Sequence, residues 1–148
     1  QVTAVLYNFL EGCSGLTSLD LRPLSQVTVV QPAFLQGCTG LITLDLSPLS
    51  QVTVVQDSFL QGCSGLTTLD LSPLSQLTEV SRGFLDGCSG LNRLDLSGLS
   101  QVTEIPLDSF LEGCTRLDVV ENPPMCIPPS GWEVRVFNTT GNSKWVRL

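Results

Sequence analysis

The sequence contains no histidine and only seven basic side chains among its 148 residues. Without histidine, the chain cannot form a Ser-His or Cys-His nucleophile pair or a His-ligated metal site. Its net charge of −7 argues against nucleic acid or an anionic membrane as a partner. It also has no apolar run near the roughly eighteen residues that suggest a membrane span. We therefore expect a protein that is not an enzyme and that has no cofactor and no resident metal.

A repeat of constant length organises most of the chain. Cysteines recur at steps of twenty-five, and the fifth follows one position later than that spacing: Cys13, Cys38, Cys63, Cys88 and Cys114. The first two units read QVTAVLYNFLEGCSGLTSLDLRPLS and QVTVVQPAFLQGCTGLITLDLSPLS, and the fifth unit departs from this pattern after Val120. A fixed period of this length is typical of repeat architectures, in which stacked units bury a continuous core that no unit buries alone.

Each unit contains the same succession of short elements. The L-x-x-L-x-L stretch at residues 16–21 predicts the inward side of a short strand, and V-T-x-V at 2–5 predicts a second extended segment on the opposite wall. The F-L-x-G-C stretch at 9–13 predicts a helical or 3-10 turn closed by glycine, and Pro23 favours a corner. Stacking would place parallel strands about 4.8 Å apart.

These phrases resemble the leucine-rich repeats of the BspA-like family. The resemblance rests on LTSLDL, F-L-x-G-C-S-G-L and V-T-x-V, covers residues 1–121, and is strongest to the repeats of surface proteins in flagellate protists, although the family's usual unit is a little shorter. It implies an α/β fold, a right-handed leucine-rich-repeat solenoid with parallel strands and short helical or 3-10 turns. It also implies an extracellular or cell-surface location and protein binding without catalysis.

The sequence changes character after the repeats, so we expect a solenoid of five coils at 1–121 and a tail at 122–148. The tail starts with the Pro-rich ENPPMCIPPSG, and WEVRVF, NTTGN and SKWVRL then predict a β-hairpin. The hairpin either caps the last coil or docks onto another molecule. Asn138 begins an N-glycosylation sequon in the expected turn, which would suit a glycoprotein on a secretory route.

The five repeated cysteines are expected to be free, buried thiols. All five should point the same way into the core, and parallel side-chain vectors suit a disulfide poorly. Zinc binding is disfavoured because the spacing contains no C-x-x-C pair. Cys126 stands outside this column, so either a Cys114–Cys126 disulfide pins the tail to the last coil or both remain unpaired thiols.

A column of carboxylates is expected on the strand face: Asp20, Asp45, Asp70 and Asp95. Each lies between two inward leucines, so its side chain should point outward, and stacked carboxylates repel one another. Solvent and neighbouring hydroxyl groups are the expected compensation, with a cation such as calcium or a basic ligand as the alternative. Acid–base catalysis is disfavoured, because a regular row offers no unlike environments to separate the pKa values.

Residues that differ between units mark surface that packing does not dictate. We expect ligand contacts among them, with neutral variation on a solvated face as the alternative. The chosen residues are Tyr7, Asp57, Arg82, Asn92 and Arg93. Tyr7 is the one aromatic candidate for a binding anchor.

The two ends of the chain suggest self-association. Residues 1–121 hold four basic and thirteen acidic side chains, whereas 122–148 hold three basic and one acidic. The first unit should expose apolar residues, so either more repeats precede Gln1 or another molecule's tail covers it. A head-to-tail contact of that kind generates filaments. Its expected interface comprises Gln1, Val2, Trp132 and Trp145. The resulting prediction is a scaffold for protein–protein interaction that assembles head to tail, with a monomeric surface recognition or adhesion module cut from a longer array as the alternative.

Overall fold

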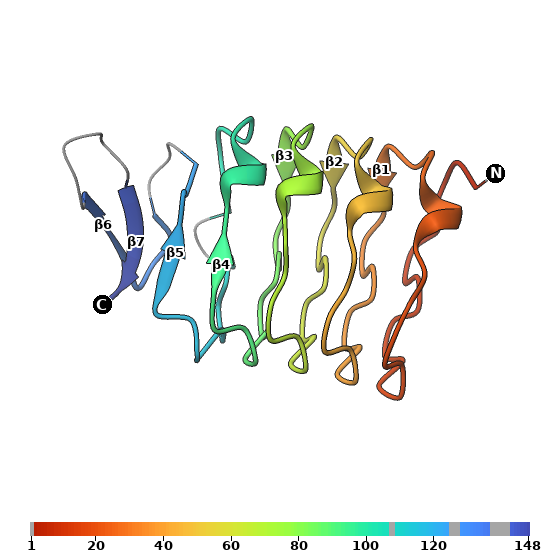
Figure 1. Cartoon of the computed structure of the whole chain (residues 1–148), viewed down its shortest axis with the longest axis horizontal. Helices are drawn as coiled ribbons and strands as arrows, with labels where there is room; N and C mark the ends of the chain where they lie inside the picture. The colour runs from red at the N-terminus through yellow and green to blue at the C-terminus, as the bar shows by residue number, and fades with distance from the viewer. Residues whose placement is uncertain (1, 107–108, 125–127, 137–142) are drawn as a thin grey trace.

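A computed structural model of the protein describes residues 2–106, 109–124, 128–136 and 143–148. Within these ranges the chain forms short strands, 3-10 helices and turns, with no α-helix. Successive units lie side by side, with the first unit at one end and the C-terminal hairpin at the other (Figure 1). The described chain is therefore a mixed structure of strands and sheets with very little helix.

Three of the strands form a parallel sheet from the V-T-x-V segments. They are β1 (Val29–Val30), β2 (Val54–Val55) and β3 (Glu79–Val80). Val29 pairs with Val54, which in turn pairs with Glu79. Partners are thus one full unit apart, so the period of the sequence is the register of this sheet.

A second sheet has the order β4-β5-β7-β6. Its strands are β4 (Leu94–Asp95), β5 (Val119–Glu121), β6 (Trp132–Val136) and β7 (Ser143–Arg147). The first two run parallel, and β7 and β6 add to them as an antiparallel hairpin. The predicted hairpin is confirmed.

The L-x-x-L-x-L segment, predicted to form a strand in every unit, does so only late in the chain, at β4 and β5. Its leucines point inward as expected, since Leu44 and Leu46 are buried. In the earlier units, few backbone hydrogen bonds join the L-x-x-L-x-L segment of one unit to that of the next. One of them is donated by Thr67 N–H to the Ile42 carbonyl at 3.2 Å. The burial pattern of these segments was therefore predicted correctly. Their predicted parallel pairing is present in the later units, where Asp70 forms a parallel bridge with Asp95 and β4 pairs with β5.

A ladder of phenylalanine rings passes through the core: Phe9, Phe34, Phe59, Phe84 and Phe110. Adjacent rings are nearly parallel, with centroids 5.4 to 5.6 Å apart. Trp145 of β7 meets Phe110 edge-on at 6.2 Å and ends the ladder. Offset or edge-on aromatic pairs add about 0.5–1.5 kcal/mol each beyond the apolar area that they bury.

The F-L-x-G-C stretch forms a left-handed turn, which corrects the prediction of a helical or 3-10 turn there. The leucine has φ between 54° and 61° in all five units, and the following glycine also has positive φ. This backbone aims N–H groups at neighbouring units: Leu35 N–H donates to the Phe9 carbonyl at 2.9 Å, and Gly12 N–H donates to the Gln36 carbonyl at 2.7 Å. A 3-10 turn would direct those groups within the unit instead.

The 3-10 helices follow the L-x-x-L-x-L segment of each unit, at the position where proline was predicted to form a corner. They are η1 (Arg22–Leu24), η2 (Ser47–Leu49), η3 (Ser72–Leu74) and η4 (Ser97–Leu99). Proline is in the first turn of η1, η2 and η3, where its fixed φ suits the helix and its missing N–H costs nothing. The leucine of each helix is buried.

The C-terminal hairpin covers the last unit. Trp145 is fully buried and Trp132 is 6% exposed. Arg147 lies over the Trp132 ring at 4.7 Å and donates to the carbonyls of Cys114 and Leu117 at 2.6 and 2.9 Å. This burial corrects the prediction that Trp132 and Trp145 contact another molecule, because both side chains are used within the chain.

The repeated cysteines are free thiols, as predicted. Each thiol from the second unit onward donates to the carbonyl of a leucine in the preceding unit, as Cys63 does to Leu35 at 3.1 Å. Burial raises the pKa of the Cys63 thiol to about 12 and that of Cys114 to about 11. The thiolate is the reactive form, so these cysteines serve packing.

One glycine position tests the stacking of units directly. A Cβ on Gly65 would overlap the carbonyls of Thr39 and Leu41, whereas the equivalent Gly15 has open space around its Cβ position. We expect Gly65→Ala to lower the free energy of unfolding by about 1–3 kcal/mol, as overpacking does. Gly15→Ala should change it by less than about 0.5 kcal/mol. Urea unfolding of both variants measures this, and an equal effect of the two would contradict the stacking described.

Candidate functional site

The aspartate column lies on the outward side of the L-x-x-L-x-L segments. Each carboxylate accepts the backbone N–H two residues further on, at the start of the next 3-10 helix. The distances are 2.9 Å for Asp20 to Arg22 and Asp45 to Ser47, and 2.8 Å for Asp70 to Ser72 and Asp95 to Ser97. Bonds of this kind are Asx-turns, so the first role of the column is to fix the corner of each unit.

Hydrogen bonds lower the pKa of three of these carboxyl groups. The Arg22 side chain, which bonds and pairs with Asp20, lowers the pKa of that carboxyl to about 2. Hydrogen bonds from Ser47 lower the pKa of Asp45. Partial burial raises the pKa of Asp95, but hydrogen bonds from Ser97 and Asn122 outweigh it and the net change is downward. These groups remain ionised at neutral pH and are therefore poor proton donors there.

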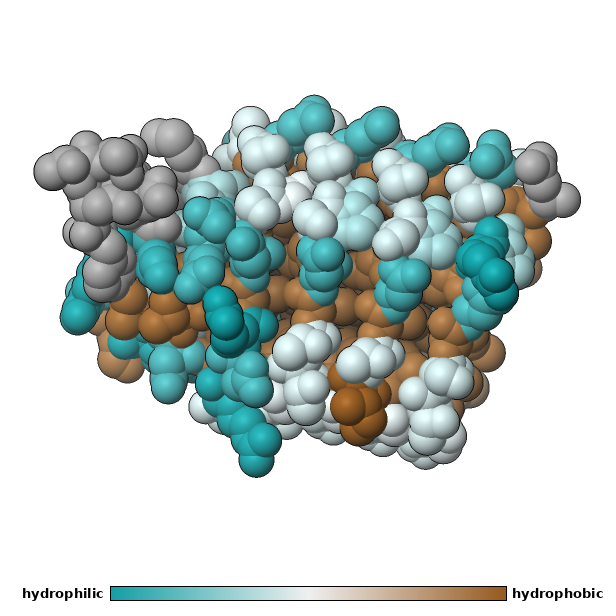
Figure 2. Space-filling model, viewed as in Figure 1, coloured by the Kyte–Doolittle hydropathy of each residue, from teal (hydrophilic) through white to brown (hydrophobic). Residues whose placement is uncertain are grey.

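A groove of about 620 Å³ opens on the same face, across units three to five and the hairpin. Its lining consists of Thr68, Leu69, Asp70, Asn92, Arg93, Leu94, Asp95, Val119, Glu121 and Lys144. Hydrophilic side chains form a row across this face, with apolar surface between them (Figure 2). The combination of apolar floor and charged rim is typical of a surface that binds another molecule.

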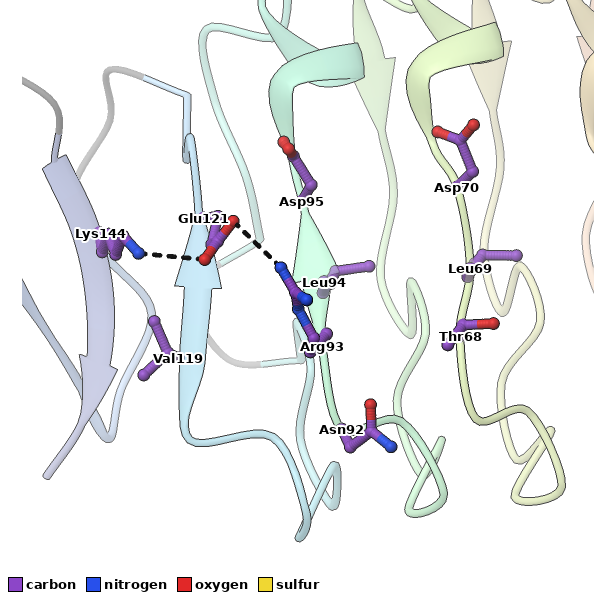
Figure 3. A pocket seen from close by; sticks show the side chains of 10 residues that line it. All are labelled: Thr68, Leu69, Asp70, Asn92, Arg93, Leu94, Asp95, Val119, Glu121 and Lys144. Carbon is purple, nitrogen blue, oxygen red and sulfur yellow. Dashed lines mark hydrogen bonds and ion pairs between the residues drawn. The ribbon is translucent and has the colours of Figure 1, made fainter.

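Glu121 lies between the two cationic side chains of this groove (Figure 3). Its carboxylate lies 3.0 Å from the Lys144 ammonium and 3.8 Å from the Arg93 guanidinium. Glu121 and Lys144 are each about one-third exposed, whereas the Arg93 side chain is 80% exposed. Arg93 is thus held at one end by a long, exposed ion pair and keeps donor groups available for a ligand.

The structure brings together only part of the predicted ligand surface. Asn92 and Arg93 line the groove with Asp70 and Asp95. The other variable residues follow the V-T-x-V segments, on the β1–β3 side: Tyr7, Asp57 and Arg82. Among them, Tyr7 is 67% exposed, and the Asp57 carboxylate accepts the Arg82 backbone N–H at 3.2 Å. Gln1, Cys126 and Asn138 lie outside the described residues, so the glycan stays a prediction. Cys114, the expected disulfide partner of Cys126, is a free thiol.

Two charged residues of the groove were missed from the sequence. Glu121 pairs with Asp95 in the β4–β5 register, so it extends the carboxylate column into the fifth unit, displaced by the one-residue insertion. An alignment that allowed for the insertion would have found it. Its second neighbour along the chain is Pro123, which has no N–H, so its carboxylate is free to bind Lys144 instead. Lys144 reaches the site through the hairpin, and no repeat predicts that.

The described residues include no group of three or more Asp, Glu, Cys or His side chains placed to hold a metal ion. The search of these residues for a helix long and apolar enough to cross a membrane finds none. Comparisons with protein-family models, curated proteins and solved structures return no match. The case for a function therefore depends on the geometry of the chain itself.

The Asx-turns provide a test of the column's structural role. At neutral pH, Asp45→Ala should lower the melting temperature by a few degrees because the Ser47 N–H loses its acceptor, while Asp45→Asn should retain most of the stability because an amide oxygen accepts the same bond. Thermal unfolding followed by circular dichroism measures both. Equal losses in the two variants would contradict this role.

The pH dependence of stability gives a second test of Asp45. A lowered pKa in the folded state stabilises the protein above the unfolded value of about 4, and that stability is lost as the pH falls through the folded value. The advantage of the native protein over Asp45→Asn should therefore shrink as the pH is lowered from about 5 toward 2. A pH-independent difference would show that the carboxylate charge plays no part.

Proposed function

We propose that this chain is a right-handed leucine-rich-repeat solenoid of the BspA-like kind, and that it is a non-catalytic scaffold that binds another protein through the groove around Glu121. The unit-to-unit register of β1, β2 and β3 supports the solenoid, and so do the stacked phenylalanines. The hairpin acts as its C-terminal cap. The observation that carries the binding role is the groove itself.

The groove fits a protein partner better than a small molecule. It is open and runs across several units, and its charges are of both signs: the carboxylates of Asp70, Asp95 and Glu121 and the cations of Arg93 and Lys144. A surface of this kind suits a partner segment with alternating polar and apolar side chains. Arg93 is the expected contact of greatest weight, since arginine is enriched at interface hot spots.

Catalysis is not supported by the chemistry of the aspartate column or of the repeated thiols. The carboxylates of Asp20, Asp45 and Asp95 have lowered pKa values and are bound by backbone N–H groups. The thiols of Cys38, Cys63, Cys88 and Cys114 have raised pKa values. Neither set is poised for proton transfer or nucleophilic attack at neutral pH. We place the scaffold outside the cell or on its surface, as the family resemblance implies.

Filament formation is a second candidate, favoured by the exposed apolar surface of the first unit. Leu6 is 78% exposed, and a hollow of about 390 Å³ is lined by Val2, Phe9 and neighbouring residues. Head-to-tail contact with a second copy would cover it. Electron microscopy over a range of concentrations tests this: filaments with an axial repeat near one molecule support it, and dispersed particles remove it.

Charge reversal tests the groove. Arg93→Asp should reduce binding of the labelled protein to intact cells of the source organism by about tenfold, since a hot-spot arginine contributes roughly 1–2 kcal/mol or more. Flow cytometry measures the bound protein. Arg82→Asp is the matched control, because Arg82 is also exposed but follows β3 and lies outside the groove. Binding that survives Arg93→Asp, or that Arg82→Asp lowers equally, would contradict a binding role for the groove.

A further inference from the structure

Strand β6 forms the open edge of the second sheet. The order β4-β5-β7-β6 leaves β6 with a strand on one side only in the described part of the chain. It is the outermost element at the C-terminal end (Figure 1). An open edge carries unpaired backbone donors and acceptors, which natural proteins cover or pair.

The direction of these groups follows from two hydrogen bonds at the end of β7. Arg147 N–H donates to the Asp118 carbonyl in the chain segment before β5, and Leu148 N–H donates to the Gly131 carbonyl before β6. Backbone groups alternate in direction along a strand, so those of Glu133 and Arg135 point toward β7. The N–H and C=O of Val134 therefore point outward, at the middle of the open edge.

The sequence around Val134 is complementary to itself in charge. If two β6 strands lie antiparallel about a two-fold axis at Val134, Glu133 of each copy faces Arg135 of the other. Val134 then forms the hydrogen-bonded pair with its own counterpart, which its outward N–H and C=O require. The two Glu133–Arg135 pairs fall at positions without backbone hydrogen bonds, where side chains approach most closely.

The exposed side chains of β6 also suit such a contact. Val134 is 47% exposed although it lies opposite the buried Trp145. Glu133 and Arg135 form an ion pair within the chain, and both remain partly exposed, at 38% and 58%. A second copy would cover Val134 with Val134 and convert two separate ion pairs into a ring of four alternating charges.

We propose that β6 pairs with β6 of a second copy, antiparallel and centred on Val134, to make a closed two-fold dimer. Two four-stranded sheets then join into one sheet of eight strands. Because opposed residues of an antiparallel pair share a face, the groove around Glu121 in each copy opens on the same side of the joined sheet. This last consequence depends on the proposed function of the groove, whereas the dimer itself does not.

Two grooves on one side would give the scaffold two binding sites for a surface that carries many copies of its partner. Binding at two sites raises the apparent affinity through effective concentration, without any new contact. A head-to-tail filament is a competing arrangement, because it would need the tail to face the first unit of the next molecule. Pairing of β6 with β6 instead uses the C-terminal hairpin in a two-fold contact, which ends the assembly at two molecules.

The test is sedimentation of the full chain and three charge variants over a range of concentrations. Glu133→Arg and Arg135→Glu each place like charges opposite one another twice per dimer, and each should weaken dimerisation by about tenfold or more. The double variant Glu133→Arg/Arg135→Glu restores opposite charges and should recover dimerisation to within about threefold of the native chain. A monomeric native chain, or a double variant as weak as the singles, would overturn the proposal.

Val134→Pro gives an independent variant with a folding control. Its missing N–H would have pointed outward, so the β6–β7 ladder keeps its bonds while the contact between copies loses its central pair. We expect loss of the dimer with a melting temperature close to that of the monomeric charge variants. A dimer that survives Val134→Pro, but is abolished by Leu6→Asp in the first unit, would place the contact at the other end of the molecule. The cell-binding test of Arg93→Asp is separate from both outcomes.

Discussion

The structure depends on backbone hydrogen bonds that pass between units at the left-handed turns. Each turn holds a leucine at positive φ, a conformation that costs about 1–2 kcal/mol for a residue with a side chain. The cost is offset because the turn directs its N–H groups into the neighbouring units, as Leu60 does to the Phe34 carbonyl at 3.0 Å. The same turn places each phenylalanine on the next ring at 5.4 to 5.6 Å. Register, ring stacking and thiol burial all follow from it.

The groove forms where this regularity ends. In units two and three the carboxylate of the column accepts the N–H at the next corner, and the face is uniform from one unit to the next. In unit five, Pro123 removes that N–H and the hairpin brings in Lys144. Glu121 then binds two cations rather than a corner, and Arg93 stands beside it largely exposed. The irregular end of the stack thus supplies the chemistry that a ligand can recognise.

Much of the fold could be predicted from the sequence, because a constant repeat length fixes which side chains lie beside one another. The inward leucines, the free thiols and the hairpin followed from that period and from alternation. The left-handed turn did not, since F-L-x-G-C satisfies the pattern of a single helical turn equally well and only contacts between units decide between them. The sequence did not decide between capping and docking for the hairpin, and so left the burial of Trp132 and Trp145 open, because the side of contact depends on how the hairpin folds back onto β5. The ion pair between Glu121 and Lys144 could not be predicted for the same reason.

Hydrogen exchange of the leucine amides in the left-handed turns tests the central claim most directly. The N–H groups of Leu35, Leu60 and Leu85 donate to the phenylalanine carbonyl of the preceding unit. The equivalent Leu10 has no such partner in the described residues. The account predicts that the first three amides exchange among the slowest in the protein, at rates set by global unfolding, and that the Leu10 amide exchanges much faster. Fast exchange at Leu35, Leu60 and Leu85, or equal protection at Leu10, would contradict it.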